Sequence, residues 1–154
     1  MMKKISPTPI LSALLSLMAL GQTQLASAHE IYGTLGYASG SIDQYQIHCF
    51  DNGDGNGAND HLYINVSDTL PVAAPLVSIQ IQRANIAKNL TDAVDGNATS
   101  SPSVNFKGGG TGNDFYILTV DKTAAGNENY KVELHCLSSS GDHVGTEFPI
   151  LTDQ

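Results

Sequence analysis

Apolar and polar residues alternate in short bursts along most of this chain. A two-residue period places successive side chains on opposite faces of a strand, so each burst predicts a half-buried β-strand. Clusters of Gly, Asn, Asp, Ser and Pro, which favour turns, separate the bursts. The bursts cover residues 31–37, 45–49, 62–66, 77–81, 104–106, 116–120, 130–136 and 148–151. The pattern predicts an all-β fold, an antiparallel β-sandwich of seven or eight short strands.

One segment offers a helical alternative. Residues 83–94, RANIAKNLTDAV, are the only stretch whose composition suits a turn or two of helix. Residues 95–103, DGNATSSPS, predict a long exposed loop. No linker divides the chain after residue 28, so we expect residues 29–154 to form a single domain.

The first 28 residues have the pattern of a secretory signal peptide. Two lysines precede an apolar run over residues 10–20, and the small residues Ala26, Ser27 and Ala28 follow it. Cleavage after Ala28 would make His29 the first residue of the mature protein. The apolar run is too short for a membrane span, which needs about 20 residues. We therefore expect a secreted or periplasmic protein without a membrane span.

The net charge of the mature protein narrows the classes of molecule that it is expected to bind. Removal of Lys3 and Lys4 with the leader leaves 5 Lys and Arg against 15 Asp and Glu, a formal charge of −10. Nucleic acids and anionic membranes repel such a surface, so we expect neither as a partner. An acidic surface is compatible with binding of metal ions, and also with protein partners or self-association.

The two cysteines, Cys49 and Cys136, predict one disulfide, because an even count in an exported protein favours pairing. The alternative is two unlinked buried thiols. If both cysteines point inward, alternation turns His48 and His135 outward. A disulfide between two sheets would then place these histidines on opposite faces, where they could not share a metal ion.

The stretch DFYILTVDKTAAGNENYKVELHC, residues 114–136, resembles the closing hairpin of secreted bacterial modules of the pre-peptidase C-terminal type. It is also similar to immunoglobulin-like domains, in which a tyrosine shortly precedes a cysteine on a late strand. The tryptophan of a true immunoglobulin domain is missing, because the chain has no Trp. Either resemblance implies a non-catalytic binding or accessory module on a β-sandwich.

Residues 51–60, DNGDGNGAND, suit a calcium site. Calcium takes about six to eight oxygen ligands, and closely spaced Asp and Asn side chains between glycines can supply them. The loop is not an EF-hand, because Tyr63 stands where the twelfth-position Glu is expected and both flanks predict strands. The alternative is a solvated turn made of residues that tolerate positive φ. The predicted calcium ligands are Asp51, Asn52, Asp54, Asn56 and Asp60.

The histidines offer a second metal hypothesis. At a processed N-terminus, His29 would present both its α-amino and its ring nitrogen to one copper ion. This one residue is similar to the histidine brace of secreted copper proteins, including lytic polysaccharide monooxygenases and some copper chaperones. A hairpin of residues 44–50 and 61–67 would also bring His48 near His61. The candidate copper ligands are therefore His29, His48, His61 and His143, and the alternative is ordinary surface histidines.

Catalytic motifs are not evident. The chain has no Gly-x-Ser-x-Gly elbow, no His-Glu-x-x-His and no phosphate-binding loop, and its acidic residues suggest no carboxylate pair. We name no catalytic residue and expect a protein that is not an enzyme. The leading hypothesis is an exported binding or accessory module with calcium at residues 51–60. The alternatives are a copper-binding protein that uses His29, and a structural subunit of a cell-surface assembly.

Overall fold

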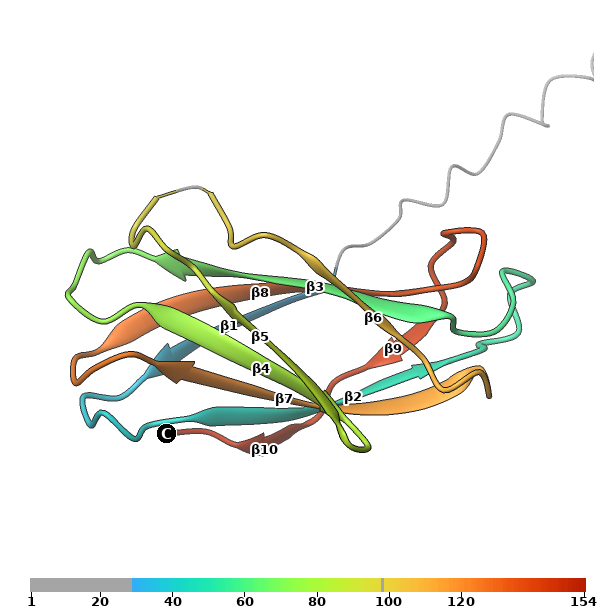
Figure 1. Ribbon diagram of the computed structural model, residues 1–154, viewed down its shortest axis with the longest axis horizontal. Coiled ribbons are helices and arrows are strands. Elements are labelled where there is room, and N and C mark those ends of the chain that lie inside the picture. The colour runs from blue at the N-terminus through green and yellow to red at the C-terminus, as the bar shows by residue number, and fades with distance from the viewer. Residues whose placement is uncertain (1–28, 98) are drawn as a thin grey trace, which may run out of the picture.

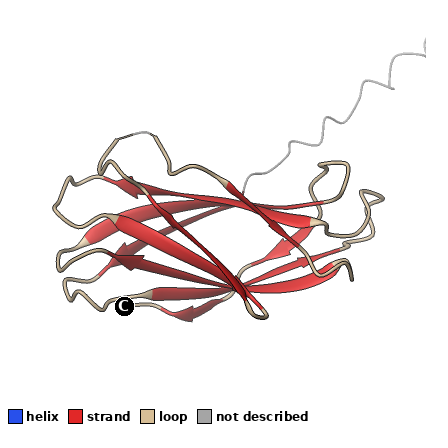
Figure 2. Ribbon diagram, in the orientation of Figure 1, coloured by secondary structure: helices blue, strands red, loops and turns tan. Residues whose placement is uncertain are grey.

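The protein is all-β, as the alternation predicts. A computed structural model describes residues 29–97 and 99–154, and within them every element is a strand (Figure 2). The ten strands are β1 (His29–Leu35), β2 (Asp43–Phe50), β3 (His61–Thr69), β4 (Val77–Arg83), β5 (Ile86–Thr91), β6 (Val104–Lys107), β7 (Asn113–Lys122), β8 (Glu128–Leu137), β9 (Gly145–Glu147) and β10 (Ile150–Thr152). The predicted signal peptide lies outside the described residues.

Two antiparallel sheets face each other (Figure 1). One has the strand order β1-β8-β3-β6, and the other has the order β10-β2-β7-β4-β5, with β9 also paired to β2. The longest pairings, β3 with β8 and β2 with β7, occupy the middle of the two sheets. Within the described part of the chain, nothing helical has the length and apolar character that a membrane crossing requires.

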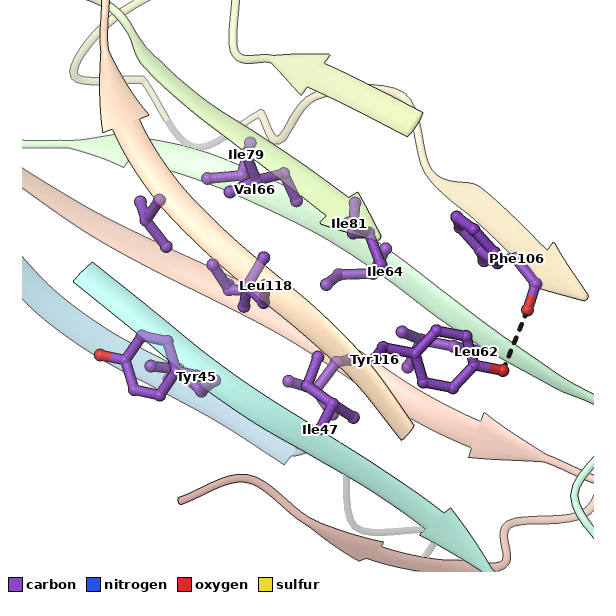
Figure 3. Close-up of a cluster of buried hydrophobic side chains, with 14 of the residues drawn as sticks. Tyr45, Ile47, Leu62, Ile64, Val66, Ile79, Ile81, Phe106, Tyr116 and Leu118 are labelled. Atoms are coloured by element: carbon purple, nitrogen blue, oxygen red, sulfur yellow. Dashed lines mark hydrogen bonds between the residues drawn. The ribbon is translucent and has the colours of Figure 1, made fainter. Parts of the chain in front are cut away.

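The hydrophobic core is formed by the alternate residues of each strand that point inward. Strands β2 and β8 bury every second residue along their whole length. Their inward side chains join those of β3, β4 and β7 in one hydrophobic cluster between the sheets (Figure 3). Tyr116 is fully buried there, and its hydroxyl donates to the Phe106 carbonyl at 3.4 Å. The hydroxyl thereby has a hydrogen-bond partner inside the core.

The predicted disulfide is confirmed. Cys49 on β2 and Cys136 on β8 are bonded, and both side chains are fully buried. Because β2 and β8 belong to different sheets, the bond is a covalent link across the core. It joins positions separated by 87 residues in sequence.

Two groups of polar residues are held in or beside the core, of which the first joins the two sheets and the second joins β4 to β7 within one sheet. The Tyr130 hydroxyl on β8 donates to the Asp43 carboxylate at 2.6 Å and lies 2.8 Å from the Tyr45 hydroxyl on β2. At the other end of β2's sheet, the Arg83 guanidinium pairs with Asp114 at 2.9 Å. Burial of these groups is tolerated because each has a hydrogen-bond partner.

Two local expectations were wrong, and one alternative is excluded. Residues 83–94 form no helix, because Ala84 takes a positive φ of 51° in a tight turn and β5 pairs with β4. The loop of residues 51–60 does not close a hairpin; it crosses from β2 in one sheet to β3 in the other. The single strand expected over residues 148–151 is replaced by β9 and β10, which are separated at Phe148 and Pro149.

Candidate metal centre

Histidines from three separate segments lie near one end of the sandwich, and two of them, His135 and His143, are in contact. His29 begins β1 and pairs with Leu134, so β1 starts beside His135 of β8. The chain after β8 turns back, and His143 forms a bridge with Leu137. This return brings the ring centroids of His135 and His143 to 4.7 Å, edge to face. His29 and His143 were predicted as ligands, whereas His135 was not.

Two ring nitrogens in this cluster lack a partner. The Nδ1 atoms of His29 and His135 are buried and have no hydrogen bond among the described residues. The other nitrogen of His135, Nε2, lies 3.0 Å from the Glu133 carboxylate. A carboxylate on one ring nitrogen fixes the tautomer and leaves the opposite nitrogen to accept a metal ion. His135 is therefore oriented as a ligand would be.

Electrostatics keep two of these rings neutral. Burial, followed by the charge of His135, lowers the pKa of His29. The pKa of His143 is lowered by burial and then by the charges of His135 and His29. A lowered pKa leaves the imidazole unprotonated at neutral pH, and only that form binds metal.

His135 and His143 open to solvent on the outer face of the four-stranded sheet, whereas His29 pairs with the buried Leu134 and packs edge-on against Phe148, so its ring lies on the inner side of β1. A shallow depression of about 290 Å³ is lined by Tyr63, Glu133, His135, Leu137, Gly141 and His143. In the described part of the chain, the three histidines do not offer nitrogens that all lie within 4.8 Å of one another. A shared ion therefore requires His29, the first residue of β1, to move toward the outer face, or coordination by two of the rings together with a further ligand.

The residues predicted as calcium ligands lie in an exposed loop whose side chains close their own turns. Asp51 Oδ1 accepts from the Gly53 amide at 2.8 Å, and Asp54 Oδ1 accepts from the Asn56 amide at 2.9 Å. Asn52 accepts likewise from the Asp54 amide at 3.4 Å. Such bonds are those of ordinary Asx turns. Calcium at these residues stays a prediction.

This loop has a second contact that the sequence did not suggest. The Asn56 side-chain amide donates to the His143 carbonyl at 2.9 Å, so the loop of residues 51–60 supports the segment that carries His143. The two loops lie together at the right-hand end of Figure 1, in teal and red. Asp60 is engaged elsewhere, since it pairs with Lys107 and lies 3.0 Å from His61 Nδ1.

His48 lies apart from the cluster, and His48 and His61 belong to different sheets, although His61 pairs with Leu137 at the edge of the depression. His48 is on the outer face of the other sheet, stacked on Phe115 with ring centroids 4.2 Å apart, and its Nε2 lies 2.6 Å from Asn113. His61 is on β3 beside Asp60 and Lys107. The expected proximity of His48 and His61 is therefore wrong. The placement of His48 and His135 on opposite faces is confirmed.

Comparison with known proteins found no matching family model, no matching curated protein and no matching solved structure. The resemblance of residues 114–136 to pre-peptidase C-terminal and immunoglobulin-like modules stays a prediction. The class defined by the structure is an all-β antiparallel sandwich with one disulfide between its sheets. Any assignment of function then depends on the chemistry of the histidine cluster itself.

Proposed function

We propose that the protein is an exported, non-catalytic β-sandwich module that binds one copper ion at a histidine cluster formed by His29, His135 and His143. The observation that carries this proposal is the pair of buried, unpartnered Nδ1 atoms on His29 and His135. A buried polar atom without a partner costs free energy, and a bound metal ion removes that cost. No comparable pair of unpartnered histidine nitrogens occurs elsewhere in residues 29–97 and 99–154.

Chemistry favours copper over other divalent ions. Cleavage after Ala28 would give His29 a free α-amino group next to its own ring, and the two nitrogens would chelate one ion. His135 or His143 would then supply a third nitrogen. The α-amino group also serves as the further ligand that coordination by only two rings requires. Sites rich in nitrogen bind Cu²⁺ more tightly than Zn²⁺ or earlier divalent metals of the series.

The roles of structural subunit and self-associating surface protein stay predictions. No described contact bears on either of them. We therefore assign neither a residue nor a surface to those roles.

We expect replacement of His29 by alanine to weaken Cu²⁺ binding by at least roughly a hundredfold. Loss of a residue that only hydrogen-bonds to a metal ligand already weakens metal binding by about 10- to 100-fold, and His29 would itself be a ligand. His135→Ala is expected to weaken it by at least about tenfold on the same scale. Isothermal titration of the exported protein with Cu²⁺ measures the affinity, and the electron paramagnetic resonance spectrum reports the nitrogen ligands. Mass spectrometry first verifies that the protein begins at His29.

His48→Ala is the matched control, because His48 is also an outward histidine beside a disulfide cysteine but lies on the opposite face. It should leave both affinity and spectrum unchanged. A form extended by one N-terminal glycine moves the α-amino group and should change the spectrum. An equal loss in His48→Ala and His29→Ala, or full displacement of copper by equimolar Zn²⁺, would contradict the proposal.

A further inference from the structure

Three carboxyl groups converge at the opposite end of the sandwich from the histidines. Asp68 lies near the end of β3, Asp95 lies in the loop after β5, and Glu128 is the first residue of β8. Each offers an oxygen such that all three oxygens lie within 4.8 Å of one another. That span is twice a Ca²⁺–oxygen bond of about 2.4 Å, so one calcium ion can reach all three groups. The end of β3, the loop after β5 and the start of β8 are at the left of Figure 1.

A second observation points to a ligand at this cluster. The Glu128 side chain is fully buried, and neither of its carboxylate oxygens has a hydrogen-bond partner among the described residues. Asp68 is also fully buried, and its Oδ1 is likewise without a partner, as is Oδ1 of Asp95. Four buried acceptor atoms without a partner on three neighbouring carboxyl groups are rare in folded proteins, and a missing ion is one of the few accounts of them.

The charges at this end are not balanced by the described residues around them. Lys122 is the nearby cation that acts on Glu128, but its ammonium group donates to the carbonyls of Gly36 and Gly126. Asp92 adds a fourth carboxylate, which accepts from the Asp68 amide at 2.8 Å. Burial and these neighbouring carboxylates raise the pKa of Asp68 to about 7. Ionised carboxylates without a counter-charge are costly to bury.

We propose that Asp68, Asp95 and Glu128 form a buried calcium site that joins β3, the loop after β5 and the start of β8. Calcium suits the cluster because it is a hard divalent cation that takes oxygen ligands in flexible geometry. The other oxygens of Asp68 and Asp95 already accept from the amides of Val77 and Ala73, and these bonds hold both groups in position. The site is therefore organised before the ion arrives. It is independent of the copper proposal.

The test is thermal unfolding of the exported protein in chelator-treated buffer, with and without calcium chloride. A melting temperature higher by roughly 5–10 °C is expected at free calcium near 100 times the dissociation constant. Glu128→Gln and Asp95→Asn should each reduce calcium affinity at least tenfold and abolish most of the shift. Because Glu128→Gln also removes repulsion between carboxylates, its melting temperature without calcium should equal or exceed that of the parent protein.

The double variant Asp51→Asn with Asp54→Asn is the matched control, since it removes two carboxylates from the other acidic loop. It should keep the full calcium shift. A shift lost in this variant but kept in Glu128→Gln and Asp95→Asn would assign calcium to residues 51–60 and overturn the proposal. The proposal would equally be overturned if saturating calcium left the melting temperature of the parent protein unchanged.

Discussion

Replacing both Cys49 and Cys136 with alanine will lower the free energy of unfolding by about 4 kcal/mol. The disulfide closes a loop across 87 residues and joins the two sheets through the core. In the chain-entropy model, a cross-link of this span removes much of the freedom of the unfolded chain, and two small cavities add to the cost. Urea denaturation of the parent and the variant, analysed as two-state unfolding, measures the difference.

The parent protein unfolded with a reductant present provides the control, because it keeps both side chains and loses only the bond. Its free energy of unfolding should fall nearly as far as that of the double alanine variant. A loss below about 1 kcal/mol in both cases would contradict the prediction and indicate that the unfolded chain is already compact.

Replacing Asp114 with alanine will cost about 3 kcal/mol of folding stability. The Asp114 side chain is 0% exposed, and its carboxylate accepts from Arg83, from the Asn59 amide at 2.8 Å and from the Gly109 amide at 2.6 Å. Its removal leaves three donors without their acceptor. The Arg83 side chain is 25% exposed and can be hydrated, which keeps the cost below that of a fully buried charge.

Asp153→Ala, at an exposed position, is the control and should change stability by less than about 0.5 kcal/mol. Denaturant unfolding of Asp114→Ala, Arg83→Ala and the double variant yields the coupling energy of the pair. A cost for Asp114→Ala no greater than that of the control would mean that water replaces all three bonds. The coupling energy separates the ion pair from the two amide contacts.

Strands could be predicted where successive residues are alternately buried and exposed. Strands without that alternation could not be predicted. Strand β8 buries every second residue, and the corresponding alternation of residues 130–136 identified it. Strand β5 is at the edge of its sheet and almost all of its residues are exposed, so no period of two marks it. The disulfide followed from two cysteines and a predicted export signal alone.

The site residues were predicted in part, for a physical reason. Alternation correctly separated His48 from His135, but it describes only residues on strands. His143 reaches His135 because the chain after β8 turns back to bridge Leu137, and such a return is not encoded in any local pattern. The sequence did not predict the acidic cluster, because no motif has a spacing that relates Asp68, Asp95 and Glu128. Only the pairing of β3 with β8 brings two of them together.

Strand β8 carries Glu128 at its first position and His135 seven residues later. Seven residues of extended chain span about 23 Å. At physiological ionic strength, charges interact over about 8 Å, so this distance is nearly three screening lengths. A copper ion and a calcium ion on the same strand would therefore scarcely repel each other. If occupancy of one site alters affinity at the other, the coupling must act through the stability of the strand they share.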